Sequence, residues 1–372
     1  MYRFKRPGLK HGDKIMVAMS GGVDSSVAAL LLKEGGFKPV GVTLRLWADP
    51  FAKENAAKNS PGYCPFDAVE EAGMVADDLS IPLHILDVQD EFCARVVSYF
   101  AGEYLQGRTP NPCIVCNRHL KFSLLLEKAY SMGIDYLATG HYARIACTPE
   151  ENICRLLRGV DRNKDQSYML CILNQEQLAR VLFPLGGYTK EEVRKMAKSR
   201  GLRTAERTES QEICFLPDND YRGFLEREYP QALTPGDILS TSGQKLGEHR
   251  GVAFYTVGQR KGLGLASQRP LYVVKIDAKN NVLVVGNEEE TYSGSLVAGG
   301  LSFISGEPPR FPLDVEVKIR YRSPLVPAVL HPPKDGFATV VFRERQKAVT
   351  PGQFAVFYRG EEVLGGGTIV SG

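Results

Sequence analysis

The sequence predicts an α/β protein in which a parallel-sheet domain is followed by a small central domain and a C-terminal β-barrel. Three observations predict it. Strands alternate with helices up to Thr139, this alternation stops after Cys214, and short strands separated by proline and glycine fill the last part of the chain. A chain of 372 residues is also too long for one ordinary core. We predict domains over residues 1–217, 218–287 and 288–372.

The N-terminal part has the pattern of a sheet covered by helices on both faces. An apolar run, a glycine-rich stretch and a helical stretch closed by Gly35 and Gly36 indicate a strand, a loop and a helix. The alternation then continues, which is typical of parallel strands. The predicted strands are residues 14–19, 38–47, 81–88 and 136–139, and the predicted helices are residues 25–34, 67–79, 89–105 and 118–132.

The pattern changes after Cys214. A helix is predicted over residues 221–228, and turn-rich sequence follows. Residues 315–321 alternate strictly between apolar and polar side chains, as a half-buried antiparallel strand does. Proline and glycine between such strands predict a small barrel. Its predicted strands are residues 271–276, 282–285, 315–321, 337–343 and 354–358.

The composition is that of a globular protein that does not cross a membrane. Hydrophobic residues make up 43% and charged residues 24%, and no apolar run is long enough for a membrane span. The basic residues 1–14 lack the apolar centre of a secretory signal, so a cytoplasmic protein is expected. The eight cysteines are scattered, which predicts reduced thiols rather than a disulfide framework. The net charge of +3 excludes no class of function, since nucleic-acid binding needs only a local basic face.

Residues 20–26, Ser-Gly-Gly-Val-Asp-Ser-Ser, lie between the first predicted strand and the first predicted helix. The two glycines allow the backbone to approach a ligand closely, and the N–H groups and dipole of the helix start favour an anion. The hydroxyls of Ser20, Ser25 and Ser26 add donors. Asp24 would repel a phosphate, so we expect it to hold Mg²⁺ or to fix the loop. The alternative is a glycine turn with serine caps.

This segment resembles the loop of the PP-loop ATP pyrophosphatases, which split ATP between its α and β phosphates and adenylate a substrate oxygen. It is not the Walker pattern, because no Gly-Lys-Ser/Thr follows. The resemblance implies a domain like the adenine nucleotide alpha hydrolases, with ATP and Mg²⁺ as cofactors. It does not identify the substrate.

Two further segments carry cysteine. In residues 109–117, Thr-Pro-Asn-Pro-Cys-Ile-Val-Cys-Asn, the two prolines predict a rigid, exposed turn before a helix. Three basic residues follow Cys116 and predict a lowered pKa for its thiol: Arg118, His119 and Lys121. Cys214 lies in Ser-Gln-Glu-Ile-Cys-Phe, residues 210–215. Cys116 and Cys214 could meet over the nucleotide site and handle sulfur, although either alone also fits a small buried residue.

Together with the loop, these segments resemble the tRNA-specific 2-thiouridylases over nearly the whole chain. Further matching motifs are Ala-Thr-Gly-His-Tyr-Ala-Arg at 138–144, Asn-Lys-Asp-Gln-Ser-Tyr at 163–168, Gly-Val-Ala-Phe-Tyr-Thr-Val-Gly-Gln-Arg-Lys-Gly at 251–262, Arg-Tyr at 320–321 and Pro-Gly-Gln at 351–353. The resemblance implies an ATP-dependent transferase that adenylates the wobble uridine of tRNA and transfers persulfide sulfur to carbon 2, giving 2-thiouridine. It also implies a sulfur-donor protein, either a cysteine desulfurase or a sulfur-relay protein.

The same resemblance implies a role for individual residues. Cys116 would be the nucleophile, and Cys214 would carry sulfur as a persulfide. Contacts with ATP are implied for Ala18, Met19, Ser20, Gly21, Gly22, Val23, Asp24, Ser25, Leu44 and Gly140. The target base would face Asn111, Pro112 and Cys113, and tRNA would contact His141, Lys164, Asp165, Gln166, Arg320, Tyr321 and Gln353.

The local charge near the C-terminus agrees with a tRNA site. Residues 310–359 contain nine Lys or Arg against four Asp or Glu, and a basic barrel suits a phosphate backbone. A solvated sheet face would have the same composition. Lys164 also fits a surface lysine paired with Asp165, and His141 fits a strand-end histidine with a structural role.

Cys113 departs from the family pattern, because familiar members have Asp at this place. The result is Cys-x-x-Cys plus Cys214, and three thiolates could hold an iron–sulfur cluster with one open iron. Cys-x-x-Cys also fits a redox pair or half of a zinc site. In the persulfide hypothesis Cys113 is a pocket-wall residue and no metal is ligated. The alternative is the same reaction with a cluster of Cys113, Cys116 and Cys214 that activates sulfide.

Two other functions share part of this pattern. A PP-loop amide-forming ligase would share the loop but would need neither paired cysteines nor a basic barrel. A non-catalytic RNA-binding module would share the barrel but would need no phosphate loop. The combination therefore favours a thiolating enzyme.

Overall fold

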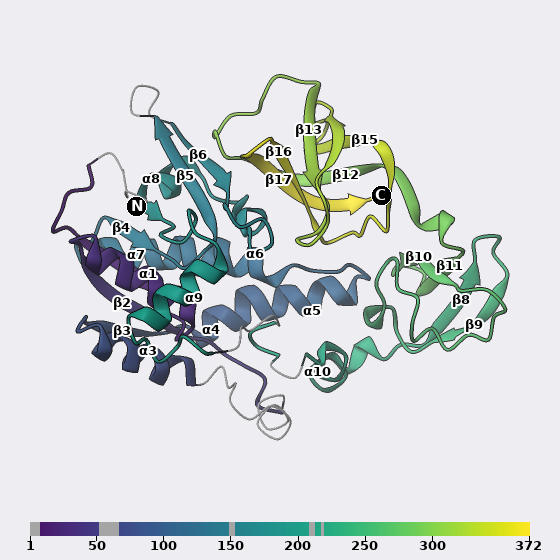
Figure 1. The fold of residues 1–372 in the computed structure, drawn as a ribbon. Coiled ribbons are helices and arrows are strands. Elements are labelled where there is room, and N and C mark those ends of the chain that lie inside the picture. The colour runs from purple at the N-terminus through teal and green to yellow at the C-terminus, as the bar shows by residue number, and fades with distance from the viewer. Residues whose placement is uncertain (1–7, 52–66, 149–152, 208–212, 217–218) are drawn as a thin grey trace.

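The computed structural model describes residues 8–51, 67–148, 153–207, 213–216 and 219–372. Figure 1 shows a helix-covered sheet, a small central sheet and a C-terminal barrel, which is the predicted fold class. The predicted domain boundary at 217/218 and the start of the basic N-terminal segment, residues 1–7, lie outside the described residues.

A five-stranded parallel sheet forms the centre of the N-terminal part. Its order is β3-β2-β1-β4-β7, so the loop after β1 opens at the middle of its carboxyl edge. The strands are β1 (Lys14–Ala18), β2 (Lys38–Arg45), β3 (Leu83–Asp87), β4 (Tyr136–Ala138) and β7 (Val181–Leu182). The four predicted strands are confirmed. The fifth, β7, has only two residues and no sequence pattern of its own.

Helices cover both faces of this sheet, as predicted. The two-residue period of a strand sends Ile15 and Val17 to one face and Met16 to the other. One face is covered by α1 (Val23–Glu34), α3 (Asp67–Asp78) and α9 (Lys190–Ser199). The other is covered by α7 (Leu125–Ser131) and α8 (Gln175–Arg180).

Two long helices contain π-helical segments. The first consists of α4 (Gln89–Phe92), η1 (Cys93–Val97) and α5 (Ser98–Leu105), which confirms the helix predicted over 89–105. The second consists of α6 (Pro112–Cys116), η2 (Asn117–Leu124) and α7.

The second helix begins before the predicted residue 118. The side chain of Asn111 caps it by accepting a hydrogen bond from the N–H of Ile114 at 3.3 Å, and Pro112 occupies the first turn, where a helix needs no N–H donor. The exposed turn predicted here is therefore wrong, since Pro110 and Pro112 are buried and Pro112 begins the helix.

The central part has its own four-stranded sheet. The predicted helix α10 (Tyr221–Glu228) packs against it through Phe224. The sheet order is β10-β11-β8-β9, with β8 (Gly236–Ser240), β9 (Lys245–His249), β10 (Tyr272–Asp277) and β11 (Val282–Gly286). The strands predicted over 271–276 and 282–285 therefore form, but in this sheet rather than in the barrel. Four short 3-10 helices complete the described helices: η3 (Ser167–Leu170), η4 (Pro230–Ala232), η5 (Val252–Phe254) and η6 (Glu289–Thr291).

The C-terminal part is a closed antiparallel barrel of six strands. Its strands are β12 (Tyr292–Phe303), β13 (Leu313–Lys318), β14 (Val326–Leu330), β15 (Phe337–Lys347), β16 (Phe354–Arg359) and β17 (Glu362–Ser371). The predicted strands at 337–343 and 354–358 are confirmed. The strand predicted over 315–321 ends at Lys318 instead, and a turn carries Arg320 and Tyr321.

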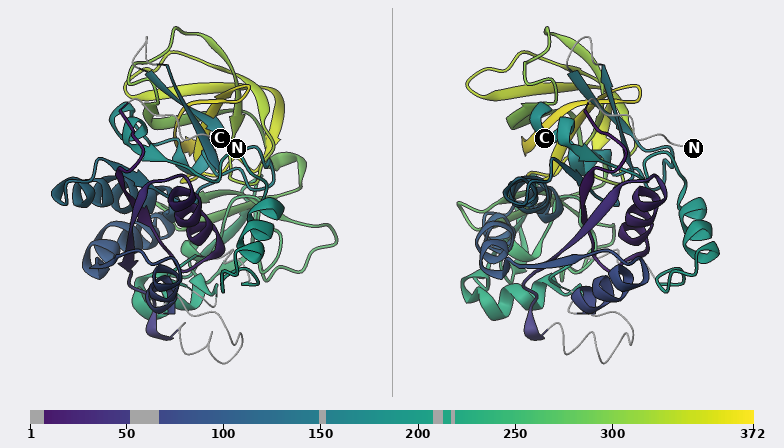
Figure 2. Two further views of the ribbon diagram at one scale, coloured as in Figure 1. Left: turned by 60° about the vertical axis from the view of Figure 1, so that its left-hand side comes forward. Right: turned by 90° about the vertical axis from the view of Figure 1, so that its left-hand side faces the viewer.

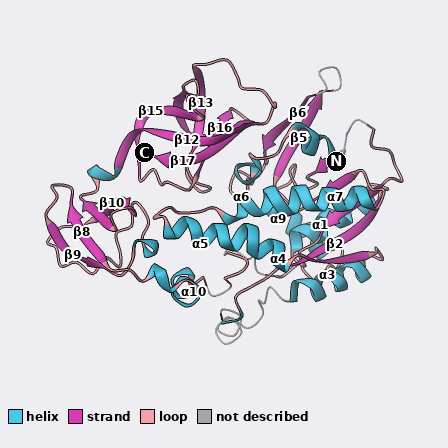
Figure 3. Ribbon diagram, turned by 180° about the vertical axis from the view of Figure 1, so that it is seen from behind, coloured by secondary structure: helices cyan, strands magenta, loops and turns pink. Residues whose placement is uncertain are grey.

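A β-hairpin joins the N-terminal part to the barrel (Figure 2). It consists of β5 (Ala143–Thr148) and β6 (Ile153–Arg158), and β6 pairs with β17. Beneath it, Tyr168 from the N-terminal part and Tyr358 from the barrel belong to one hydrophobic core. In Figure 3, seen from behind, α5 extends from the parallel sheet toward the central sheet, where Phe100 packs in a second shared core. The three parts are thus held together by shared cores.

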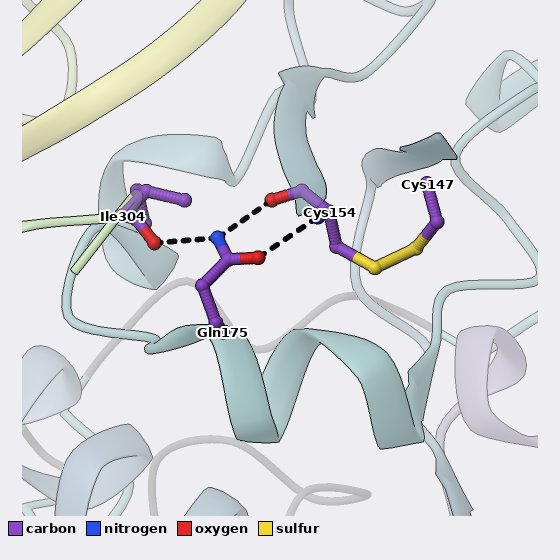
Figure 4. Close-up of a disulfide and its surroundings, with 4 residues drawn as sticks. All are labelled: Cys147, Cys154, Gln175 and Ile304. Carbon is purple, nitrogen blue, oxygen red and sulfur yellow. Dashed lines mark hydrogen bonds between the residues drawn. A yellow bond between two sulfur atoms is a disulfide. The ribbon is translucent and has the colours of Figure 1, made fainter. Parts of the chain in front are cut away.

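A disulfide between Cys147 and Cys154 ties the two strands of this hairpin (Figure 4). The prediction that all cysteines are reduced thiols is therefore wrong for this pair, because strand pairing places the two residues directly opposite each other. Gln175 also fixes the backbone at Cys154. Its side chain accepts a hydrogen bond from the N–H of Cys154 and donates to the carbonyls of Cys154 and Ile304. Among the described residues, the five cysteines outside this pair are free thiols.

Replacing Cys147 and Cys154 together by serine should lower the free energy of unfolding by about 2 kcal/mol, because the short loop that the bond closes regains its entropy in the unfolded chain. Urea unfolding without reductant measures the effect, with Cys93→Ser as the control for loss of a free thiol. Wild-type protein in which both Cys147 and Cys154 react with an alkylating agent before reduction would contradict the pairing.

Candidate active site

The loop between β1 and α1 lies at the carboxyl edge of the parallel sheet, where ligands of open α/β sheets bind. Gly21 has a φ of +70°, and a Cβ at this position would come within 2.8 Å of the Cβ of Glu71. Only glycine therefore fits here without strain. Gly22 is the N-cap residue of α1 and has no side chain that could cap it, which leaves the helix start accessible to an anion.

The serines of the loop bond mainly to the loop itself. The Oγ of Ser25 accepts a hydrogen bond from the N–H of Ser20 at 3.1 Å and donates to the carbonyl of Gly22 at 3.1 Å. The Oγ of Ser26 donates to the same carbonyl at 2.9 Å. Ser26 is fully buried, so it shapes the loop, whereas Ser20 and Ser25 also line a cavity.

The carboxylate of Asp24 forms an ion pair with a buried lysine. The ammonium of Lys190, at the start of α9, lies 2.7 Å and 2.8 Å from the two oxygens of Asp24. The hydroxyl of Tyr142 donates a further hydrogen bond to Asp24 at 2.8 Å. Of the two roles predicted for Asp24, this geometry supports fixing the loop, because both oxygens are occupied by protein donors.

A cavity of about 640 Å³ opens beside the loop, a size typical of small-molecule sites. It is lined by seven of the ten residues predicted to contact ATP: Ala18, Met19, Ser20, Asp24, Ser25, Leu44 and Gly140. Gly140 follows β4, and a Cβ there would lie 2.9 Å from backbone atoms of Asp24 and Ser25. Glycine at this position therefore lets β4 approach the loop. Gly21, Gly22 and Val23 shape the loop but do not line the cavity.

His141 lies in the wall of the same cavity. Its Nδ1 is 2.7 Å from the Oγ of Thr139, and its ring packs against Phe122 and Phe183. Burial, and secondarily the charge of Lys121, hold the pKa of His141 well below its ordinary value. The imidazole is therefore neutral at physiological pH.

Cys214 also lines this cavity, although it is distant in sequence from the loop. The next residue, Phe215, is fully buried among aromatic rings, with ring centroids 5.2 Å from Phe100 and 5.7 Å from Phe92. Cys214, in contrast, remains exposed. Phe215 thus anchors the segment and leaves Cys214 accessible at the nucleotide cavity.

Cys113 and Cys116 lie in the first helical turn after Asn111. Cys113 is exposed, whereas Cys116 is 5% exposed and packs in the core that contains Phe215. Phe215, the neighbour of Cys214, packs in that same core. The fold therefore places the segment of Cys214 and the helix of Cys116 against one shared core.

The predicted lowering of the Cys116 pKa is wrong. Desolvation by the surrounding protein raises the pKa of Cys116, Cys113 and Cys214, although the last two residues keep exposed surface, and the positive charge of Lys121 opposes the increase in all three. The sequence shows the nearby cations but not the desolvation, which is the larger effect here.

The three cysteines do not form a metal site. Among the residues that the structure describes, no group of three or more His, Cys, Asp or Glu side chains could hold a metal ion. The iron–sulfur alternative is therefore not supported.

Comparison with known proteins supports the division of the chain seen in the fold. Family models match residues 13–218 (tRNA methyl transferase HUP domain), 222–287 (tRNA methyl transferase PRC-barrel domain) and 293–369 (aminomethyltransferase beta-barrel domain). The tRNA-specific 2-thiouridylase MnmA of Natranaerobius thermophilus is 49% identical, over 96% of this chain and 97% of that protein. The enzyme of the same name from Carboxydothermus hydrogenoformans is 50% identical over the same shares.

The chain belongs to the tRNA-specific 2-thiouridylase family. The resemblance predicted from the motifs is thus confirmed. A solved 4-thiouridine synthetase–RNA complex with bound ATP is also similar, at 18% identity over 59% of this chain and 51% of that chain, but its TM-score of 0.36 adds no support. No helix in the described part of the chain is long and apolar enough to cross a membrane.

The motif at 163–168 of this thiouridylase has mainly a structural role. The buried carboxylate of Asp165 accepts hydrogen bonds from the N–H groups of Gly159 and Ser167, and forms an ion pair with Arg158 at 3.2 Å. Asp165 is therefore paired with Arg158, and its carboxylate is bonded within the protein. Lys164 lies in the turn before it and is half-buried.

Gln166 connects this motif to the cavity. Its Oε1 accepts a hydrogen bond from the N–H of Tyr142 at 3.0 Å, and the residue lines the cavity. Because Tyr142 also bonds Asp24, the motif supports the loop as well as the cavity wall.

The barrel residues predicted to contact tRNA lie beside the cysteine helix. Gln353 donates hydrogen bonds to the carbonyls of Thr109 and Pro110 at 3.0 Å and 3.1 Å. Arg320 donates to the carbonyl of Ala348 and to Thr350, and the ring of Tyr321 packs near Tyr168. Gln353 therefore holds the segment that leads into Asn111, and Arg320 holds the barrel turn around Ala348 and Thr350.

Two residues of the site escaped sequence analysis. Lys190 begins α9 after the capping residue Thr189, and nothing in the sequence links it to Asp24. Arg207 donates a hydrogen bond to the carbonyl of Gly21 at 3.0 Å, from a segment with no predicted element. Only the tertiary fold reveals these partners.

Proposed function

We propose that this member of the 2-thiouridylase family uses ATP to adenylate the 2-oxygen of the wobble uridine of tRNA and replaces that oxygen with sulfur. One observation supports this most directly: the cavity beside the glycine loop is also lined by Cys214. An adenylated base and a sulfur carrier can thus meet in one place. The cysteine pair and the tRNA-modifying relatives favour this over an amide-forming ligase or a non-catalytic module.

ATP binds at the loop, with its phosphates at the start of α1. The proposed ATP contacts are Ala18, Met19, Ser20, Gly21, Gly22, Val23, Asp24, Ser25, Leu44 and Gly140. Mg²⁺ would supply charge neutralisation of the triphosphate, and phosphate oxygens would be its main ligands, as is usual for this ion. Asp24 keeps its pairing with Lys190 and acts by holding the loop.

Activation of the base consumes one ATP. The wobble uridine is splayed from the anticodon stack into the cavity, since its 2-oxygen is unreachable in a stacked loop. That oxygen attacks the α phosphorus, the bond to the β-phosphate oxygen breaks, and pyrophosphate leaves. AMP is now the leaving group on carbon 2.

Sulfur transfer then uses both cysteines. The terminal sulfur of a Cys214 persulfide, as its anion, attacks carbon 2, and AMP leaves with the former 2-oxygen. The Cys116 thiolate attacks the Cys214 sulfur, which forms a Cys116–Cys214 disulfide and leaves one sulfur on the base. Release of the same sulfur as hydrosulfide before the attack on carbon 2 gives the same products. In both routes a dithiol reductant supplies two electrons that regenerate the thiols.

The remaining assignments follow the family resemblance. Asn111, Pro112 and Cys113 face the target base, and the tRNA contact region comprises His141, Lys164, Asp165, Gln166, Arg320, Tyr321 and Gln353, of which Asp165 acts by positioning its neighbours. A cysteine desulfurase or sulfur-relay protein charges Cys214. We place the protein in the cytoplasm, with domain boundaries at 217/218 and 287/288, which the three family-model matches support.

The test is mass spectrometry of tRNA after incubation with the protein, ATP and a persulfide donor. We expect the mass of the wobble uridine to increase by about 16 Da, the difference between sulfur and oxygen. The increase should depend on ATP and be accompanied by release of AMP and pyrophosphate. Reactions without ATP or with a non-hydrolysable analogue are the controls. Adenylation of a substrate other than tRNA, followed by amide formation, would instead favour the ligase. Unmodified tRNA together with no ATP turnover would favour the binding module.

A further inference from the structure

Lys121 occupies a distinctive place between the nucleotide cavity and the thiols. It lies in η2, and because backbone hydrogen bonds of a π-helix join residues five apart, it stands one turn after Cys116. It also lines the cavity together with Cys214 and His141. A single ammonium group is thus presented to both the loop and the sulfur chemistry.

The charge of Lys121 is not neutralised by a carboxylate. Within the described ranges, no ion pair or hydrogen bond to its ammonium group is present, and the side chain is half-buried. Two other cations near the cavity are paired: Lys190 is bonded to Asp24, and Arg45 lies 3.4 Å from Asp87. Lys121 is therefore available to an anion that forms during the reaction.

Sulfur anions form beside it, because Cys214 lines the same cavity and Cys116 precedes Lys121 by one turn of η2. Desolvation by the cavity wall disfavours the thiolates of Cys113, Cys116 and Cys214, and Lys121 opposes that effect at each of them. The remaining titratable and charged groups around this region are Asp24, Arg45, Glu70, Arg118 and His141. Of these, Asp24 and Arg45 are paired with protein groups and His141 is neutral.

We propose that Lys121 is the positioning residue whose positive charge holds the sulfur of Cys214 and Cys116 in its anionic, reactive form. The proposal deepens the proposed function and rests on it for the identity of the reaction. A buried thiol reacts slowly because only the thiolate is the nucleophile. An unpaired ammonium in the same low-dielectric wall offsets this cost without a proton transfer of its own.

The experiment measures the pH dependence of alkylation at Cys214, using iodoacetamide and site-resolved mass spectrometry of the full-length protein. The variants are Lys121→Met, which removes the charge at similar length, and Lys121→Arg, which keeps it. Lys128→Met on α7 is the matched control, because it removes a lysine from the same continuous helix away from the cavity lining.

We expect the alkylation rate of Cys214 at neutral pH to fall about tenfold in Lys121→Met, as a shift of its profile by about one pH unit requires. Lys121→Arg should stay within about twofold of the wild type, and Lys128→Met should match it. An unchanged profile in Lys121→Met would overturn the proposal. So would an unchanged profile with a raised KM for ATP in pyrophosphate release, because Lys121 would then bind phosphate. A variant that unfolds, seen as a lost thermal transition, is replaced by Lys121→Gln.

Alkylation needs neither tRNA nor ATP, so the two proposals fail separately. A shifted profile in a protein that never thiolates tRNA would refute the proposed function and leave the effect of Lys121 standing. Normal thiolation of tRNA with no shift of the Cys214 alkylation profile in Lys121→Met would refute the role of Lys121 and leave the proposed function standing.

Discussion

Asp24→Ala should reduce tRNA-dependent pyrophosphate release by about 100-fold or more, because a misplaced phosphate loop no longer aligns the reacting atoms. The carboxylate ties the first turn of α1 to Lys190 and Tyr142. Its loss also leaves the ammonium of Lys190, a residue only 8% exposed, without its partner, and an unpaired buried charge costs about 3–5 kcal/mol. The measurement is initial pyrophosphate release at saturating ATP, with a thermal melt to show that the variant is folded.

A double variant separates the two roles predicted for Asp24. If the carboxylate acts by pairing, Asp24→Asn combined with Lys190→Met should recover much of the activity that either change alone removes, because no buried charge is left unpaired. If it ligates Mg²⁺, the double variant should be as inactive as Asp24→Asn. Lys195→Met is the control on α9, since it breaks only an exposed pair with Glu191. Full activity of a folded Asp24→Ala protein would contradict both roles.

Cys214→Ser should abolish thiolation and leave adenylation within about threefold of the wild type, because serine cannot carry a persulfide, whereas the loop is untouched. The two steps are measured separately, as 2-thiouridine by mass spectrometry and as pyrophosphate release with tRNA present. Cys171→Ala is the control for loss of a buried thiol outside the cavity. Thiolation that survives in Cys214→Ser would move the sulfur carrier to another residue.

The barrel cannot serve as a detachable tRNA-binding module in such experiments. Phe354, Val356 and Tyr358 belong to the same core as Tyr168, and β17 pairs with β6. Gln353 also holds Thr109 and Pro110 directly before the cysteine helix. Truncation at residue 287 would therefore expose the core and release the cysteine segment. Point changes at exposed barrel residues are the cleaner test of tRNA contact.

The predicted site divides into residues that act at the cavity and residues that support it. Ser20, Asp24 and Ser25 of the glycine loop, Gly140 and Cys214 were predicted as ligand or sulfur contacts, and the structure places them around one cavity. Asp165 was predicted to touch tRNA but is buried and bonded internally. Motif matching identifies both kinds of residue equally well, because a buried carboxylate that orders a turn leaves the same sequence signal as one that contacts a ligand.

By itself, the sequence determined the local elements and the family. Local patterns can be recognised from the sequence because they depend on neighbouring residues. Strand periodicity, the glycine loop at a helix start and the ordered motifs are of this kind. The tertiary structure alone decided which distant groups meet: Lys190 with Asp24, Gln353 with Thr109, Cys147 with Cys154, and β10 and β11 in the central sheet. It also reversed the expected shift in the Cys116 pKa. The physical reason is the same in each case: pairing and desolvation depend on distance in space and on burial, which neighbouring residues in the chain do not specify.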